Sequence, residues 1–198
     1  MYSRKTALFS TLLVTAFAIT AFASHHEMEP YKLGDEVKPF SLKSVEDETY
    51  EMQDALGEEV IVVYFWNCNC PFSRAYENHL IELSNEYKEK KVSFWVIDSN
   101  VTNDKQTIQE YAEEHELPYP VLKDPESKIA DRFAAERTPE VFVIGMDKKI
   151  HYHGAPADAQ NPDEAETLYM KAAIDALLEG NEPEMKQTKA FGCTIKRG

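Results

Sequence analysis

The sequence predicts an α/β fold in which a central mixed sheet is flanked by helices. Three observations predict it. Residues 60–66 form an unbroken run of β-branched and aromatic residues, which is typical of a strand buried on both faces of a sheet. A helical pattern and a second apolar run at 92–97 follow, so these segments form a βαβ unit with two parallel strands. Residues 141–144 predict a third buried strand, and residues 150–153 predict its antiparallel partner.

The remaining elements follow from apolar periodicity and from turn residues. In chain order they are two edge strands at 37–42 and 49–52, an amphipathic helix at 104–115, a short extended piece at 121–122, a short helix at 128–133 and a last helix at 162–178. The two edge strands are an N-terminal addition to the sheet. Gly180 is expected to end the last helix.

The 198 residues divide into four expected segments. Residues 1–23 have the pattern of a signal peptide: a basic start, a charge-free apolar stretch and a small-x-small cleavage pattern at 21–23. Residues 24–30 are expected to be a flexible lead-in, 31–180 the folded domain and 181–198 a C-terminal tail. The alternative for the first segment is an uncleaved membrane anchor. We expect cleavage, hence a periplasmic or secreted protein without stable membrane insertion, in a compartment where disulfides persist.

The charge of the chain excludes some partners. The formal net charge is -14. Nucleic acids and anionic membrane surfaces are bound through basic patches. We therefore expect no nucleic-acid partner.

Cys70 lies where the first buried strand gives way to a helix. Pro71 suits the first helical position, and residues 72–87 carry one apolar face, with Glu77 among the acidic residues expected to face solvent. The free N–H groups and the helix dipole at such a junction stabilise a thiolate, which is the reactive form of cysteine. We expect Cys70 to be a nucleophile. The alternative is a buried structural cysteine that packs as a small apolar residue.

A nucleophilic cysteine needs a second thiol if it is to complete a redox cycle. Ser73 occupies the third position after Cys70, so this C-x-x-S motif can attack a disulfide but cannot resolve the product itself. Cys68 is two residues away, where a disulfide ring would be strained. Cys193 lies thirteen residues beyond Gly180, in a tail that we expect to be mobile and long enough to cross the domain. Both cysteines stay open as resolving residues.

Several short motifs together resemble a known family. F-W at 65–66 followed by C-P at 70–71 resembles the active-site segment of periplasmic thiol-disulfide oxidoreductases. The segments 33–35 and 138–144 resemble redoxins of the alkyl hydroperoxide reductase/thiol-specific antioxidant superfamily. The G-C-T-I-K motif at 192–196 resembles a thioredoxin-like redoxin subfamily of uncertain substrate.

The resemblance implies a thioredoxin-like fold in which Thr138 and Pro139 form a cis-proline loop that faces Cys70. The backbone of Thr138 would then pair with a bound polypeptide or mixed disulfide. The implied activity is a thiol-disulfide oxidoreductase without a cofactor, acting on disulfide-bonded protein and served by a thiol reductant. The further residues expected to line the substrate site are Trp66, Pro71, Ser73 and Arg137.

A thiol peroxidase acting on a hydroperoxide is the second interpretation, because two-cysteine peroxidases also use a distant resolving thiol. Peroxiredoxins carry Thr or Ser three residues before the reactive cysteine, and this chain has Asn67 there. Arg137 could still supply positive charge near the thiolate.

A Cu(I)-binding chaperone is the third interpretation, since soft thiolates select that ion. Cys68 and Cys70 would need a histidine such as His79 or His153 as a further ligand. We expect no metal site, because His79 lies more than two helical turns from Cys70 and His151 and His153 are expected to be solvent-exposed on an edge strand.

Overall fold

The computed structural model describes residues 29–198. The predicted signal peptide at 1–23 and most of the predicted lead-in lie outside these residues. None of the helices between residues 29 and 198 has the length and the apolar character that a membrane span requires.

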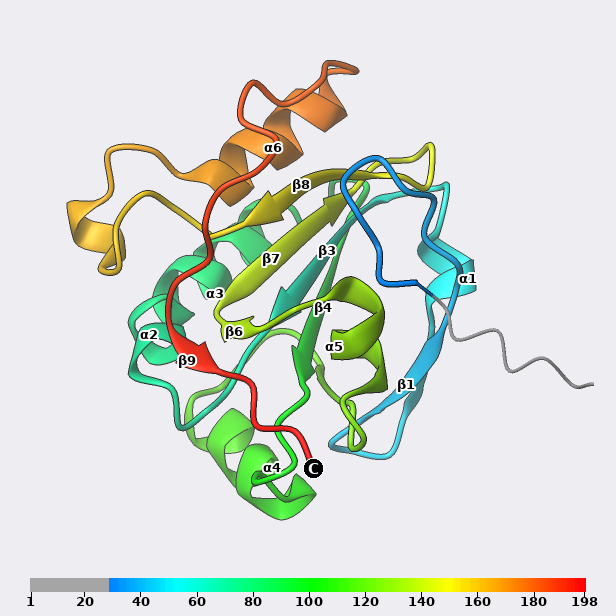
Figure 1. Cartoon of the computed structure of the whole chain (residues 1–198). Helices are drawn as coiled ribbons and strands as arrows, with labels where there is room; N and C mark the ends of the chain where they lie inside the picture. The colour runs from blue at the N-terminus through cyan, green and yellow to red at the C-terminus, as the bar shows by residue number, and fades with distance from the viewer. Residues whose placement is uncertain (1–28) are drawn as a thin grey trace, which may run out of the picture.

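A seven-stranded mixed sheet forms the centre of the molecule, in the order β2-β1-β5-β4-β3-β7-β8 (Figure 1). Its strands are β1 (Ser41–Ser44), β2 (Thr49–Glu51), β3 (Val60–Phe65), β4 (Val92–Asp98), β5 (Val121–Lys123), β7 (Glu140–Ile144) and β8 (Ile150–Gly154). β3 pairs in parallel with β4 and antiparallel with β7, and β7 pairs antiparallel with β8. The predicted βαβ unit, the antiparallel partner and the N-terminal edge strands are thus confirmed. The short strands β6 (Arg137–Thr138) and β9 (Cys193–Thr194) form a separate pair.

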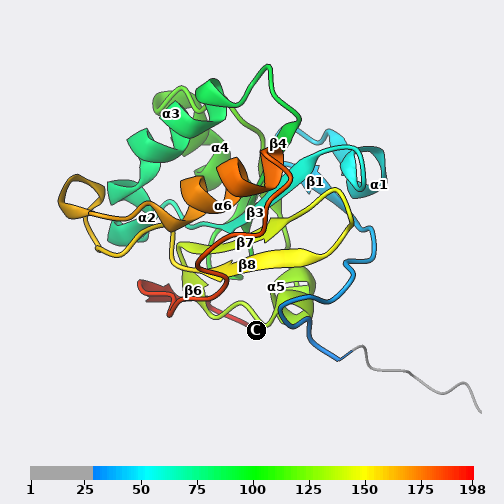
Figure 2. The same ribbon diagram turned by 90° about the horizontal axis from the view of Figure 1, so that it is seen from above.

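Helices cover both faces of the sheet. They are α1 (Met52–Ala55), α2 (Pro71–Ala75), α3 (Glu77–Glu86), α4 (Lys105–Glu114), α5 (Lys128–Phe133), the 3-10 helix η1 (Pro162–Glu164) and α6 (Tyr169–Leu178). Figure 2 shows α3, α4 and α6 on one side of the sheet and α5 on the other. This confirms the predicted α/β class with a central mixed sheet flanked by helices.

The strand β3 is buried on both faces, as its unbroken apolar run predicts. Val62 and Tyr64 pack into the core under α3, α4 and α6, whereas Val63 and Phe65 pack into the core under α5. The alternation places the end of β3, and therefore Cys70, at the boundary between two well-packed layers.

Two predicted helices are shorter than the sequence indicates. The helix after Cys70 breaks at Tyr76, which ends α2 and precedes α3. Tyr76 is buried there, and its hydroxyl donates to the carbonyl of Ala159 at 2.5 Å. The last helix starts at Tyr169 rather than at 162, because the Asp158 carboxylate accepts the backbone N–H groups of residues 166 and 167 and keeps them out of a helix.

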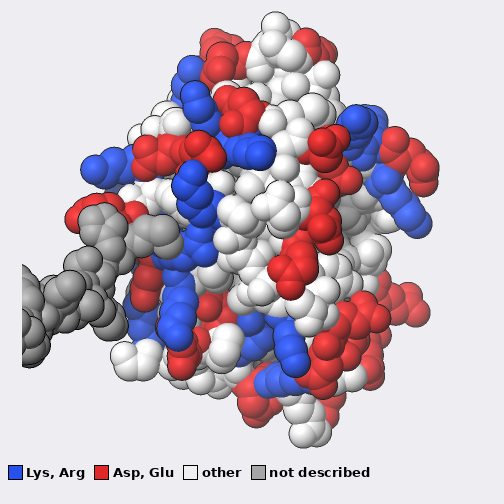
Figure 3. All heavy atoms as spheres, turned by 90° about the vertical axis from the view of Figure 1, so that its right-hand side faces the viewer, with Lys and Arg blue, Asp and Glu red and all other residues white. Residues whose placement is uncertain are grey.

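Charge is spread over the surface on the face shown in Figure 3. Acidic and basic side chains lie interspersed there around a central area of uncharged residues. The excess of acidic residues is therefore not gathered into one patch on this face.

Candidate active site

Cys70 is held at the carboxyl end of β3 as the residue that precedes α2. The turn before it is fixed by Asn67, whose side-chain oxygen accepts the N–H of Asn69 at 2.7 Å and whose carbonyl accepts the N–H of Cys70 at 3.0 Å. Only 1% of Cys70 is exposed, and its thiol donates to the carbonyl oxygen of Thr138 at 3.0 Å. The strand end and the turn thus aim the sulfur at the segment before β7.

The Thr138–Pro139 peptide bond is cis, as the resemblance implied. Thr138 is the second residue of β6, so its carbonyl lies beside the Cys70 sulfur at the point where the chain enters β7. The expected cis-proline loop facing Cys70 is confirmed.

The C-terminal tail is docked on this loop, whereas the sequence indicates a mobile segment. β9 pairs antiparallel with β6, with Thr138 opposite Cys193 and Arg137 opposite Thr194. The N–H of Ile195 donates to the carbonyl of Glu136 at 2.9 Å, and the Ile195 side chain is buried in the core under α5. Burial of Ile195 and the backbone pairing explain why this charged segment lies on the domain.

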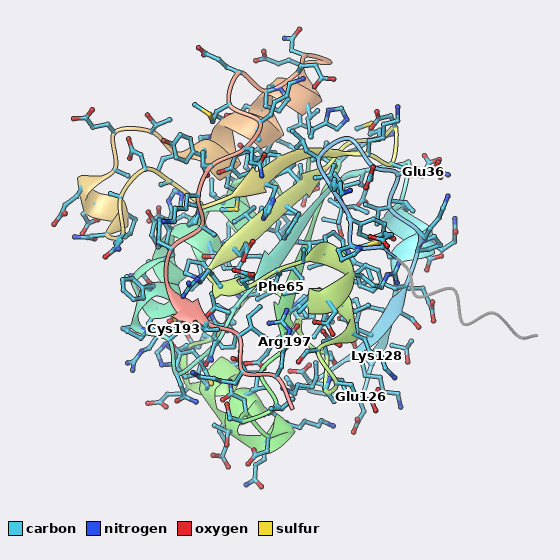
Figure 4. All side chains as sticks on the ribbon, viewed as in Figure 1. Glu36, Phe65, Glu126, Lys128, Cys193 and Arg197 are labelled. Atoms are coloured by element: carbon cyan, nitrogen blue, oxygen red, sulfur yellow. The ribbon has the colours of Figure 1, made fainter. Side chains whose placement is uncertain are left out.

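Gly192 allows the tail to approach the cis-proline loop. A Cβ atom at this position would lie 2.1 Å from the carbonyl oxygen of Thr138, and the backbone has φ +111°. Both the contact and the conformation require glycine. Figure 4 shows Cys193 on β9 and Arg197 further along the tail toward α5. Arg197 is held there by the carboxylate of Asp131 at 2.7 Å.

Cys70 differs in acidity from the other two cysteines. Burial acts to raise the pKa of Cys70, but hydrogen bonds from Cys193 and Thr138 and from the backbone N–H of Ser73 outweigh it, and the pKa is lowered. Burial, the hydrogen bond to Cys70 and the charge of the Cys70 thiolate raise the pKa of Cys193 to about 11. Burial and the neighbouring Asp98 carboxylate raise the pKa of Cys68 to about 11.

The acidity of Cys70 has one expected source and one that the sequence does not indicate. The backbone N–H of Ser73, in the first turn of α2, is one of the free N–H groups expected to favour the thiolate. The hydrogen bonds from Cys193 and Thr138 are the additional source, and they come from segments far along the chain.

Cys68 lies away from this cluster of hydrogen bonds. Its side chain is 3% exposed and belongs to the core under α3, α4 and α6. The structure therefore brings together Cys70 and Cys193, and it places Cys68 in apolar packing.

The other predicted substrate-site residues are distributed around Cys70. Pro71 is exposed at the start of α2, and Ser73 is buried with a hydroxyl that has no hydrogen-bond partner among residues 29–198. Arg137 donates to the hydroxyl of Thr194 on the tail at 3.0 Å. Trp66 is fully buried and packs edge-to-face on Tyr111, so it lies beneath the site, inside the core.

Glu140 supports the cis-proline loop and is a residue that the sequence analysis did not single out. It is 3% exposed, and one carboxylate oxygen accepts the backbone N–H groups of Glu136 and Arg137. The other oxygen is 2.6 Å from Nε2 of His153, which stacks on Phe142. The prediction of a solvent-exposed His153 is wrong, because the ring pairs with this buried carboxylate. A glutamate at the head of an apolar strand is the signal that could have identified the pair.

His151 is also more enclosed than predicted. Its two ring nitrogens lie 2.8 Å from Asp147 and 3.0 Å from Glu182, and 12% of the side chain is exposed. The ring links the turn after β7 to the start of the tail, so it is not free on an exposed edge.

Glu77 is buried, although the sequence analysis placed it on a solvent-facing side of the helix. Its carboxylate accepts the Tyr111 hydroxyl at 2.7 Å and lies 2.6 Å from Nδ1 of His115. Both partners come from α4 and its end. The carboxylate therefore joins α3 to α4 beneath the site.

A buried polar network lies beside the active-site turn, at the carboxyl end of β4. The Asp98 carboxylate accepts from Lys123 at 2.8 Å and from the side chain of Asn103 at 2.6 Å. Asn103 also donates to Asn67 at 3.0 Å, while Asn100 accepts the backbone N–H of Lys196 at 2.9 Å. One network thus holds both the turn before Cys70 and the docked tail. Burial raises the pKa of Asp98 despite the nearby Lys123.

The copper interpretation finds no support in the described geometry. In residues 29–198, no group of three or more His, Cys, Asp or Glu side chains is arranged to hold a metal ion. His153 is paired with Glu140, and His79 is half-buried on α3 with its pKa lowered by burial.

Comparisons with known proteins identify the family of the chain. The model of the AhpC/TSA family matches residues 33–153, so the tail with Cys193 lies outside the match. The thiol-disulfide oxidoreductases ResA of Halalkalibacterium halodurans and Oceanobacillus iheyensis are each 26% identical to the chain, covering 62% and 71% of it and 70% and 76% of the relatives. The crystal structure of an uncharacterized conserved protein from Geobacillus kaustophilus is 31% identical, covers 87% of this chain and 94% of its own, and has a TM-score of 0.77. The expectation of a thioredoxin-like, thiol-dependent oxidoreductase is thereby confirmed, and the chain belongs to the AhpC/TSA family.

Proposed function

We propose that this protein is an exported thiol-disulfide oxidoreductase in which Cys70 attacks substrate disulfides and Cys193 resolves the mixed disulfide. The observation that carries the proposal is the backbone pairing of Cys193 with Thr138. The carbonyl of Thr138 also accepts a hydrogen bond from the Cys70 thiol. The relatives named thiol-disulfide oxidoreductases support the reaction type. Export rests on the signal-peptide pattern of residues 1–23.

The first step uses the lowered pKa of Cys70. The Cys70 thiolate attacks one sulfur of a substrate disulfide, a new Cys70–substrate S–S bond forms, and the substrate S–S bond breaks. The second substrate sulfur leaves as a thiolate and takes a proton from solvent. While the tail is docked, hydrogen bonds from Cys193 and Thr138 lower the pKa of Cys70 and so favour its thiolate.

The second step follows from the charge that Cys70 loses. The Cys70 thiolate is one of the causes that raise the pKa of Cys193. Once Cys70 is part of a mixed disulfide, this charge is gone, and Cys193 releases its proton more readily. The Cys193 thiolate then attacks the Cys70 sulfur, the Cys70–Cys193 disulfide forms, and the substrate leaves as a thiolate. A thiol reductant returns both cysteines to the reduced state with two electrons.

Cys193 is preferred over Cys68 as the resolving residue on packing grounds. Cys68 lies in an apolar core, where burial raises its pKa to about 11. The pKa of Cys193 is raised to the same value, but the Cys70 thiolate is one of its causes, and the mixed disulfide removes that charge. A bridge between Cys68 and Cys70 would also close a strained ring.

Peptide-level mass spectrometry of mature protein prepared without reductant, with free thiols trapped in acid, tests the assignment. We expect a Cys70–Cys193 bridge in the wild type and in Cys68→Ser. We expect a persistent mixed disulfide at Cys70 in Cys193→Ser, and an N-terminus at Ser24 in the exported fraction. A bridge to Cys68 would transfer the resolving role to that residue. Reduced protein that reacts rapidly with hydrogen peroxide but not with disulfides would replace the reductase by a peroxidase.

A further inference from the structure

The docked tail occupies the backbone edge that faces Cys70. We define the tail strand as residues 191–196. It pairs with β6, and no other strand of the described chain does so. Gly192 brings its backbone against the Thr138 carbonyl, which leaves no room for a second chain between them. A polypeptide that pairs with β6 must therefore displace the tail strand.

Side chains of the tail strand are bound on both sides of its cysteine. Before Cys193, Phe191 packs against Phe72 and Tyr76, with ring centroids 6.3 and 5.9 Å apart. After Cys193, the Ile195 side chain is 3% exposed in the core under α5.

Backbone hydrogen bonds hold the tail strand in an extended form after its cysteine. The N–H of Ile195 donates to Glu136, the N–H of Lys196 donates to the side chain of Asn100, and the carbonyl of Lys196 accepts the N–H of Val101. These are the contacts by which a groove binds an extended polypeptide: main-chain hydrogen bonds together with pockets for alternate side chains.

The tail strand thus presents a cysteine to Cys70 in the way that a bound substrate would. The family resemblance already implies that a polypeptide pairs with the backbone at Thr138. We propose that the tail strand is an internal competitor for this pairing, and that it shows the sequence pattern of the substrate segment. This inference rests on the proposed role of Cys70. The preferred substrate segment has an aromatic residue and a glycine before its cysteine and an apolar residue two positions after it, as residues 191–195 have.

The competition links resolution to product release. The tail strand leaves β6, the substrate segment pairs there, and Cys70 forms the mixed disulfide described above. When the tail strand returns, Cys193 attacks the Cys70 sulfur and the substrate leaves as a thiolate. The returning tail strand also displaces the substrate backbone from β6. The substrate therefore loses its disulfide to Cys70 and its backbone pairing with β6 in the same step.

A redox-inert peptide tests the groove on the full chain. The peptide has the sequence of residues 190–197 with serine in place of Cys193. In the protein, Gly192→Ala places a Cβ atom against the Thr138 carbonyl and is expected to lift the tail strand, which hydrogen exchange at the Ile195 amide reports. Ile195→Asp is a second route to the same state. Lys189→Ala is the matched control, because Lys189 is exposed in the same tail.

We expect the peptide to bind both lifted variants on the order of tenfold tighter than it binds the wild type or Lys189→Ala, because the wild-type groove is occupied. A peptide with alanine in place of its glycine should not bind. The inference is overturned if the peptide binds the wild type and all variants equally. It is also overturned if the peptide does not bind a variant in which the Ile195 amide has lost its protection from hydrogen exchange. If the Ile195 amide stays protected in both variants, the tail strand has not left β6, and the proposed competition is overturned.

A separate assay keeps this outcome distinct from that of the proposed function. Wild-type protein should reduce the disulfides of insulin in a reaction that Cys70→Ser abolishes. If this reaction is present and the peptide results are negative, only the groove is lost. If the reaction is absent, the proposed function itself fails.

Discussion

The carboxylate of Glu140 accepts the backbone N–H of Arg137 at 2.8 Å, three residues back along the chain. The cis-proline bond lies between these two residues, so the hydrogen bond closes the loop that faces Cys70. The same oxygen accepts the N–H of Glu136, whose carbonyl pairs with the tail. A single buried carboxylate thus supports the surface on which Cys193 docks.

Glu140→Gln should destabilise the fold and slow the first thiol-exchange step. Hydrogen bonds to charged groups contribute about 1.5–3 kcal/mol each, and the amide keeps an acceptor oxygen for the two backbone N–H groups but removes the negative charge, so we expect a loss of about 2–3 kcal/mol. Urea unfolding measures the loss, and trapping of the mixed disulfide measures the rate. Glu136→Gln is the control, because its side chain is exposed. Equal behaviour of the two variants would contradict the role of Glu140.

Alkylation of Cys70 should persist below the pH range of an ordinary thiol. A free cysteine titrates near ~8.5. Because hydrogen bonds lower the pKa of Cys70, its thiolate, and hence its reaction with iodoacetamide, should be lost only at a lower pH. Cys193→Ala removes the side-chain hydrogen bond from residue 193 and keeps the backbone one, so it should move the midpoint to higher pH. Peptide-resolved alkylation rates between pH 4 and 10, with Cys68→Ser as the control, measure the shift; a midpoint that does not move would assign the acidity to other groups.

Oxidation should make the protein more resistant to unfolding. A bridge between Cys70 and Cys193 closes a loop of about 120 residues, and loops of this length lower the entropy of the unfolded chain by up to about 4–5 kcal/mol in free energy. Urea titrations with and without reductant should therefore differ for the wild type and coincide for Cys193→Ser. A difference that survives in Cys193→Ser would point to another bridge.

Glu77→Gln should lower stability without abolishing the reactivity of Cys70. The carboxylate joins α3 to α4 through Tyr111 and His115, and none of the hydrogen bonds around the Cys70 sulfur involves it. We expect a loss of about 1–3 kcal/mol in thermal or urea unfolding. Glu82→Gln, on the exposed face of α3, should change little. If Glu77→Gln instead abolished reaction with a small disulfide at full stability, a direct role in proton transfer would follow.

The stability supplied by His151 should depend on pH. Burial acts to lower its pKa, but the neighbouring Asp147 and Glu182 carboxylates raise it overall. A pKa raised in the folded state contributes stability below the unfolded value of about 6.5, and this contribution is lost as the pH rises through the folded value. The wild type should therefore lose its advantage over His151→Gln above that range. A constant difference from pH 5 to 9 would show that the ring acts through packing alone.

Local sequence patterns were sufficient for the sheet and for the turn that carries Cys70. The apolar run at 60–66 and the proline after Cys70 fix the strand, the turn and the helix start without reference to distant residues. The burial of Glu77 and the docking of the tail could not be read in this way. Glu77 depends on Tyr111, and Gly192 depends on the Thr138 carbonyl. Each contact joins segments far apart in the chain, which periodicity does not encode.

The network around Asp98 also constrains how this site can change during evolution. The side chain of Asn103 donates a hydrogen bond to Asn67 in the turn before Cys70. The side chain of Asn100 accepts the backbone N–H of Lys196, three residues after Cys193. The turn before Cys70 and the backbone after Cys193 are therefore both hydrogen-bonded to residues that follow the end of β4. Substitutions at residues 67, 100 and 103 should accordingly be found together in related sequences, even though none of these side chains takes part in thiol exchange.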